Sequence, residues 1–245
     1  MLKQPLNKYI DHTLLKPDAT IEQLENLLEE AAKFEFSSVC VSPTFAGILG
    51  EINTKVSFPF DVCTVAGFPH GNIPTEMKLQ EAFYFIERGV KEIDFVINYG
   101  ELKNNNLTYV VNEIKRLSDV CAERKVVSKF IVETCYLTRE EKIAIFNWMA
   151  DFCPNADFIK TSTGFGLSGA QLEDVALWSE LRLRNELQGD KPGPLIKAAG
   201  GIKDLNTALA FIEAGAHRLG MSTGVKVMEE YLAHEKTFTE GATSS

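Results

Sequence analysis

Short apolar segments alternate with longer amphipathic ones along the whole chain, and this alternation limits the folds open to it. The apolar segments predict eight strands, at residues 9–15, 38–42, 62–67, 92–98, 127–133, 157–162, 195–199 and 218–222. Helical patterns separate them. Strands that alternate with helices are parallel and are joined by crossover helices.

Capping patterns mark the boundaries of several helices. A Ser or Thr followed three residues later by Glu or Gln is typical of a capping box, and this pattern occurs at residues 20–23, 138–141 and 168–171. Pro74 opens a helix that we expect to end at Gly89, and the apolar helical segment 206–213 is expected to end at Gly215.

The strand count and the length of 245 residues fit a single (β/α)8 TIM barrel in the α/β class. A doubly wound open sheet is the alternative topology. The sequence has no linker and no shift in composition, so we expect one domain over residues 1–245. Residues from about 235 to 245 are polar and are expected to form a flexible tail.

Composition excludes some classes of function. The net charge of −9 argues against general binding of nucleic acids or anionic membranes. The five cysteines are odd in number and have no Cys-x-x-Cys spacing, so neither a disulfide framework nor a zinc site is predicted. No apolar segment is long enough for a signal peptide or a membrane span, and we expect a cytoplasmic protein.

Two lysines occupy matching positions late in two predicted strands, Lys160 in the sixth and Lys197 in the seventh. The catalytic groups of a barrel gather at these strand ends. A free lysine is neutral at pH 7 only about once in 2,500 molecules, and lowering its pKa to about 7 costs the charged form about 4.6 kcal/mol. A second ammonium about 5 Å away supplies roughly 3 kcal/mol of this. The pair therefore predicts a neutral amine able to form a Schiff base with a carbonyl substrate.

Acidic side chains on the predicted strands are candidates for the proton transfers that a Schiff-base reaction requires. Asp94 lies within an apolar strand, and strand alternation places it on one face with Val96 and Asn98. It is a candidate general acid/base, and Asp11 is a second inward candidate. The structural alternatives stay open, because a strand-end lysine commonly extends to solvent and an aspartate in a strand commonly forms an ion pair.

Glycines after the last two predicted strands indicate an anion site. Gly200 and Gly201 follow the seventh strand, and residues 220–224 close the eighth and begin a helix. Loops at these places in a barrel frequently bind phosphate through backbone N–H groups and a helix N-terminus; ordinary tight turns are the alternative. The match to G-x-G-x-x-G at residues 164–169 follows the sixth strand and opens no dinucleotide-binding unit, so we reject that interpretation.

The motifs around both lysines resemble those of the deoxyribose-phosphate aldolase family of class I, Schiff-base aldolases. The likeness lies in residues 158–164 and 197–203 and extends through residues 10–15, 39–43, 65–69, 92–98 and 218–220. The resemblance implies reversible aldol cleavage of 2-deoxy-D-ribose 5-phosphate to D-glyceraldehyde 3-phosphate and acetaldehyde, in deoxyribonucleotide catabolism. The bond expected to break is the C3–C4 bond of the sugar. The resemblance implies no cofactor and no metal. It implies a homodimer or a homotetramer.

The resemblance also implies residue roles. Lys160 is the Schiff-base nucleophile, Lys197 tunes its pKa and relays protons, and Asp94 is the general acid/base. The implied substrate-binding residues are Asp11, Cys40, Thr163, Gly164, Gly200, Gly201, Lys203, Gly220, Ser222 and Thr223.

Three departures from the family pattern bear on substrate binding. Phe165 stands where some members carry a lysine near the phosphate, Met221 replaces a smaller residue, and residues 241–245 lack a terminal tyrosine.

Three rival functions are open from the sequence. The chain could be another class I aldolase or a transaldolase acting on a different phosphosugar. It could also be a non-catalytic barrel that senses sugar phosphates. A metal-dependent aldolase is the third, although the sequence has no His cluster for a metal.

Overall fold

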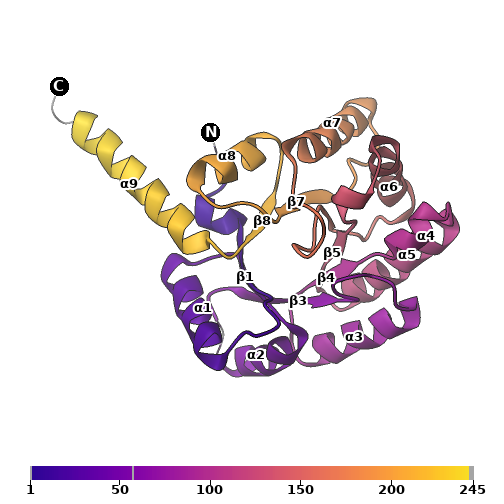
Figure 1. Cartoon of the computed structure of the whole chain (residues 1–245), viewed down its shortest axis with the longest axis horizontal. Helices are drawn as coiled ribbons and strands as arrows, with labels where there is room; N and C mark the ends of the chain where they lie inside the picture. Colours follow the sequence, from indigo (N-terminus) through magenta and orange to yellow (C-terminus); the bar gives the residue numbers. More distant parts are fainter. Residues whose placement is uncertain (1, 57, 243–245) are drawn as a thin grey trace.

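Eight parallel strands close into a barrel in sequence order, as predicted (Figure 1). The computed structural model describes residues 2–56 and 58–242. The strands are β1 Ile10–Leu14, β2 Ser38–Val41, β3 Asp61–Ala66, β4 Glu92–Val96, β5 Val127–Ile131, β6 Phe158–Lys160, β7 Leu195–Ala199 and β8 Arg218–Met221. Because β1 pairs with β8, the sheet has no open edge, and the open-sheet alternative is wrong.

Helices surround the barrel as an outer ring, and α9 extends away from it toward the C-terminus (Figure 1). The α-helices are α1 Ile21–Phe34, α2 Pro43–Val56, α3 Thr75–Glu87, α4 Tyr99–Lys103, α5 Leu107–Glu123, α6 Arg139–Phe152, α7 Leu172–Gln188, α8 Leu205–Glu213 and α9 Gly224–Ala242. Short 3-10 helices are η1 Leu6–Tyr9 and η2 Thr134–Tyr136. The part of the chain that is described contains no helix that is both long and apolar enough to cross a membrane.

Two of the three predicted capping boxes are confirmed, at Thr20 and Thr138. The third is wrong, because α7 begins at Leu172 and its N-cap Gln171 makes no capping bond with its side chain. Residues 168–171 are held instead by the barrel, since the Ala170 N–H donates to carbonyls of β7 and the next turn. The predicted stops of α3 and α8 are confirmed, with Gly89 and Gly215 at positive φ just beyond their ends.

The predicted tail begins within α9. The backbone of α9 is helical through Ala242, and the flexibility of the chain from about residue 235 stays a prediction. Residues 243–245 of that prediction lie outside the described residues.

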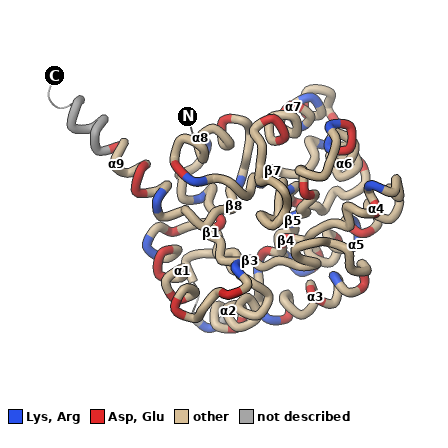
Figure 2. The backbone as a smooth tube through the Cα atoms, viewed as in Figure 1, with Lys and Arg blue, Asp and Glu red and all other residues tan. Residues whose placement is uncertain are grey.

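The two faces of each strand differ in chemistry. In β4, Ile93 and Phe95 belong to the apolar core between strands and helices, whereas Glu92 and Asp94 alternate with them and are buried on the opposite, inner face. Figure 2 shows most charged positions on the outer ring of helices and a smaller set on the central strands. The barrel interior is therefore a buried, charged layer enclosed by an apolar shell.

Candidate active site

The two predicted lysines are direct neighbours across the barrel wall. Lys160 is the last residue of β6 and pairs in register with Lys197 of β7. Both ammonium nitrogens lie 2.7 Å from the same carboxylate oxygen, Oδ2 of Asp94. The structure thus brings all three predicted catalytic residues together. A carboxylate joins the two amines, where the sequence predicted direct repulsion between them.

A third lysine that the sequence analysis missed completes this contact. The Nζ of Lys129, on β5, lies 2.9 Å from Oδ1 of Asp94 and 2.7 Å from Oε2 of Glu92. Lys129 is fully buried. Strand alternation in 127–133 could have found it, because it occupies an inward position within an apolar segment.

At the N-terminal ends of the strands, which we call the lower end of the barrel, an arginine completes this cluster. Arg218, the first residue of β8, forms ion pairs with Asp11 and with Glu92, the latter at 3.0 Å. It also donates to the hydroxyl of Ser38 at 3.2 Å. Asp11 in turn lies 2.5 Å from Nζ of Lys197. The cluster therefore holds four cationic side chains, Lys129, Lys160, Lys197 and Arg218, and three carboxylates, Asp11, Glu92 and Asp94.

These contacts decide which form each buried group adopts. Burial alone would raise the pKa of Asp94, but Lys129, Lys160 and Lys197 together hold that pKa well below its usual range. Burial likewise opposes the charge on Lys197, yet the carboxylates of Asp11 and Asp94 raise its pKa above the ordinary value. These carboxylates therefore favour the charged form of Lys197 beside Lys160.

A pocket of about 640 Å³ opens over Lys160. Eight of the ten predicted substrate-binding residues line it: Thr163, Gly164, Gly200, Gly201, Lys203, Gly220, Ser222 and Thr223. Phe165 and Met221, which depart from the family pattern, line it too. The sequence did not predict Lys16 and Lys226, which also border the pocket because the loop after β1 and the first turn of α9 reach it.

Three glycines that line this pocket have backbone N–H groups without an acceptor among the described residues. Gly164, Gly200 and Gly201 all have positive φ, at +89°, +86° and +82°. Among the hydrogen bonds of residues 2–56 and 58–242, none has the N–H of these three glycines as donor. A Cβ at Gly164 or Gly201 would meet no atom within 4 Å, so the space beside them is open. With the N-terminus of α9 at Gly224, they form a cradle suited to an anion.

Two predicted substrate-binding residues do not reach the pocket. Asp11 and Cys40 are fully buried inside the barrel, at 0% and 1% exposure, and neither lines the pocket. Asp11 is occupied by Lys197 and Arg218. Their contact with substrate stays a prediction, since both side chains are buried and neither lines the pocket.

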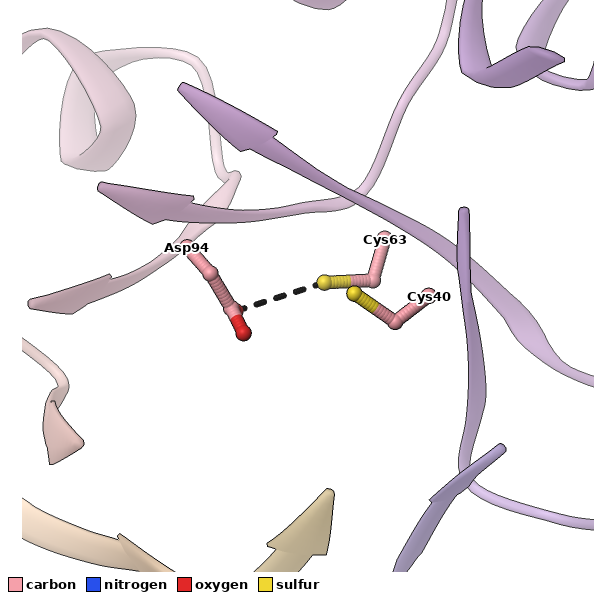
Figure 3. A group of neighbouring side chains, drawn as sticks. All are labelled: Cys40, Cys63 and Asp94. Atoms are coloured by element: carbon pink, nitrogen blue, oxygen red, sulfur yellow. Dashed lines mark hydrogen bonds between the residues drawn. The ribbon is translucent and has the colours of Figure 1, made fainter. Parts of the chain in front are cut away.

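Cys40 instead points toward Cys63 and Asp94 inside the barrel (Figure 3). One ligand atom from each of these residues lies within 4.8 Å of the others, a spacing compatible with a metal ion. Both oxygens of Asp94 already accept hydrogen bonds from lysine ammonium groups. A cation there would have to displace them within an already positive cluster, so the donor set does not fit a metal site.

Comparison with known proteins identifies relatives over nearly the whole length. The sequence model of the DeoC/LacD family aldolases matches residues 6–230. A deoxyribose-phosphate aldolase of Thermococcus gammatolerans is 44% identical over 229 residues, which cover 94% of this chain and 97% of that protein. One of Streptococcus gordonii is 45% identical over 224 residues, 91% of this chain and 96% of that protein.

Solved structures of aldolases share the fold. A deoxyribose phosphate aldolase of Aeropyrum pernix, described as tetrameric, superposes with a TM-score of 0.80 at 29% identity, over 92% of this chain and 90% of that one. A structure described as QR15, an aldolase, gives a TM-score of 0.80 at 35% identity, over 95% of this chain and 98% of that one.

Proposed function

The chain belongs to the DeoC/LacD family of aldolases, and on that basis we propose that it cleaves 2-deoxy-D-ribose 5-phosphate reversibly to D-glyceraldehyde 3-phosphate and acetaldehyde. The reaction proceeds through a Schiff base on Lys160 and serves the breakdown of deoxyribose from deoxyribonucleotides. The observation that carries this proposal is the contact of Lys160 and Lys197 with one oxygen of Asp94 at the base of a pocket.

The charge balance of the cluster supports Lys160 as the nucleophile. Four cationic side chains face three carboxylates, so the cluster balances when one amine is neutral. Lys129, Lys197 and Arg218 each touch two carboxylates, whereas Lys160 touches Asp94 alone and lines the pocket. A buried charge is tolerated where it is paired, and Lys160 is the amine with the fewest partners. Its lone pair then attacks the C1 aldehyde of the open-chain sugar.

Loss of water from the resulting carbinolamine gives an iminium at C1. The bond that breaks next is C2–C3, and our expectation of C3–C4 was wrong, because only C2 is adjacent to the iminium carbon. As the C3 hydroxyl loses its proton, the electrons of the C2–C3 bond move to form an enamine. C3 leaves as the aldehyde carbon of glyceraldehyde 3-phosphate. Protonation of the enamine at C2 and hydrolysis then release acetaldehyde and free the lysine.

Asp94 and Lys197 supply the proton transfers. Asp94 is the carboxylate in contact with Lys160, at 2.7 Å, and the positive charges of Lys129 and Lys197 hold its pKa below the usual range. Asp94 Oδ2 also lies 2.7 Å from Lys197 Nζ, and this contact does not involve Lys160, so it does not depend on the lysine that bonds to the substrate. This pair can accept the C3 hydroxyl proton and return a proton to C2, directly or through water.

The glycine cradle binds the phosphate of the sugar. Free N–H groups at Gly164, Gly200 and Gly201 and the N-terminus of α9 supply donors, and Lys203 on the pocket wall adds positive charge. Phe165 replaces a cation that some members carry, so the phosphate relies more on backbone amides.

Turnover of a panel of phosphosugars tests the proposal. We expect 2-deoxyribose 5-phosphate to be the preferred substrate, with activity insensitive to chelators, whereas a transaldolase would prefer a ketose donor and a metal-dependent aldolase would lose activity. A sugar-phosphate sensor would bind the substrate without turnover. We further propose a homodimer or homotetramer, which light scattering of the purified protein would measure.

A further inference from the structure

Glu133 is a buried carboxylate at the mouth of the barrel that the proposed mechanism does not use. It follows β5 by two residues, is 1% exposed and adopts left-handed backbone with φ of +54°. None of the ion pairs formed within residues 2–56 and 58–242 includes it. A buried charge without a cation normally has compensating hydrogen bonds, so the source of those bonds indicates its role.

Within residues 2–56 and 58–242, the nitrogen and oxygen donors to the Glu133 carboxylate all belong to Thr163, three residues after Lys160, and the Cys135 thiol lies 3.9 Å from Oε1. The Thr163 N–H lies 3.2 Å from Oε2 and 3.3 Å from Oε1, and its hydroxyl donates to Oε2 in a short contact. Thr163 is 7% exposed and lines the pocket. Glu133 thus fixes both the backbone and the hydroxyl of a pocket residue.

The Thr163 hydroxyl also links Glu133 to the residues that follow Gly164. Its oxygen accepts the N–H of Phe165 at 3.0 Å, so the peptides on either side of Gly164 are bound into one chain of contacts. Gly166 lies directly against the carboxylate, because a Cβ there would approach Cδ of Glu133 to 3.0 Å. The turn of residues 163–166 is therefore wrapped around the Glu133 side chain.

We propose that Glu133 is a positioning residue for the phosphate end of the substrate: through Thr163 it holds the 163–166 turn so that the free N–H of Gly164 points into the anion cradle. The inference rests on the proposed function and deepens it. In this view the pocket has two parts. Asp94 and the lysines form the part where the bond is broken, and Glu133 and the glycines form the part that binds the phosphate.

Comparison of a phosphorylated with an unphosphorylated substrate tests the proposal. The variants are Glu133→Gln, Thr163→Val and their combination, and the measurements are KM for 2-deoxyribose 5-phosphate, KM for 2-deoxyribose and the inhibition constant of inorganic phosphate. Each single change weakens the hydrogen bonds between Glu133 and Thr163. We therefore expect KM for 2-deoxyribose 5-phosphate and the inhibition constant of inorganic phosphate each to rise about tenfold. KM for 2-deoxyribose should change less than about twofold.

Two controls separate positioning from loss of stability. Thr163→Ser keeps the hydroxyl and should restore near-normal phosphate binding. Glu113→Gln removes a buried carboxylate that pairs with Lys78 outside the pocket, so it should lower stability and leave both KM values unchanged. Because Glu133 acts through Thr163, the double variant should be no worse than the poorer single variant.

A parallel rise of both KM values in Glu133→Gln, or multiplication of the single effects in the double variant, would overturn the inference. The proposed function has a separate readout, which is turnover and borohydride trapping of acetaldehyde by the unmodified protein. If the unmodified protein does both and Glu133→Gln keeps the normal substrate ratio, only the role of Glu133 fails. If the unmodified protein does neither, the proposed function fails.

Discussion

Polar groups at the two ends of the barrel differ in how many partners they have within the protein. At the N-terminal ends of the strands, Arg218 is bonded to Asp11, Ser38 and Glu92, so the charges of Arg218, Asp11 and Glu92 are paired with one another. At the upper end, Lys160 has one carboxylate contact and lines an open pocket. The N–H groups of Gly164, Gly200 and Gly201 beside it have no protein acceptor among the residues described.

This difference indicates that the buried charged cluster has two roles: its paired groups stabilise the barrel and its less paired groups take part in the reaction. Groups that the protein itself satisfies hold the barrel together, and groups that it leaves unsatisfied are available to a substrate. Within the cluster of four cations and three carboxylates, we assign the excess cation to Lys160, the reactive amine. Four predictions test this division, in order of decreasing effect.

Lys160→Met should abolish turnover without destabilising the fold. We expect activity to fall by at least about 10⁴-fold, since the nucleophile is lost. If Lys160 is the neutral member of the cluster, its loss leaves three cations facing three carboxylates, and the free energy of unfolding should change by less than about 1 kcal/mol. Steady-state kinetics and urea denaturation measure the two effects.

Lys129→Met, the same substitution one strand away, should have the largest effect on stability. It leaves Glu92 and Asp94 short of a buried partner, and breaking a buried pair in this way costs about 3–5 kcal/mol. Denaturation of the two lysine variants side by side gives the comparison. Equal losses of stability in both would contradict the assignment of the excess charge to Lys160.

His217 makes the lower end sensitive to acid. Burial lowers its pKa from 6.5 to about 4, and the nearby charges of Arg182 and Lys3 act in the same direction. Between these values the unfolded chain binds more protons than the folded one, so stability should decrease as the pH falls from 6.5 to 4. Allowing for partial exposure, we expect a loss of about 2 kcal/mol from this group.

Thermal unfolding of His217→Gln between pH 4 and pH 7 measures this contribution. The variant should have a shallower pH dependence than the unmodified protein. His234→Gln is the matched control, because His234 is exposed on α9, and its pH profile should match that of the unmodified protein. A similar profile for all three proteins would remove His217 as the cause.

Gly201→Ala should weaken phosphate binding, with Gly189→Ala as its control. Both glycines have similar φ, +82° and +79°, and a Cβ at either meets no atom within 4 Å. Both variants should therefore lose about 1 kcal/mol of stability from left-handed backbone strain. Only Gly201 lies in the pocket, so only its variant should raise KM for 2-deoxyribose 5-phosphate, by about tenfold.

The fold and the central chemistry could be predicted because they depend on local patterns. Apolar segments separated by capped helices fix the strand count, and the late strand positions of Lys160 and Lys197 place them at one end of a barrel. The strand ends were predicted one or two residues too long in several cases. Residue 133 was assigned to the fifth strand, whereas Glu133 is left-handed and begins the loop.

The missed features depend on contacts between distant segments. Arg218 meets Asp11 and Glu92 only after the barrel has closed, so the sequence could not show that these ion pairs involve Asp11. The capping box predicted at residues 168–171 failed because the backbone of Gly169 packs on that of Gly200: a Cβ on Gly169 would lie 2.4 Å from the Gly200 carbonyl oxygen. Such tertiary contacts override local propensity and leave no periodic signal in the sequence.

Borohydride trapping with 2-deoxyribose 5-phosphate or acetaldehyde, followed by peptide mass mapping, tests the central claim most directly. Reduction converts the Schiff base into a stable amine, so the modified residue can be identified. We predict a reduced adduct on Lys160 alone. An adduct on Lys197 would reverse the two lysines, and bound ligand without any adduct would contradict Schiff-base catalysis by this chain.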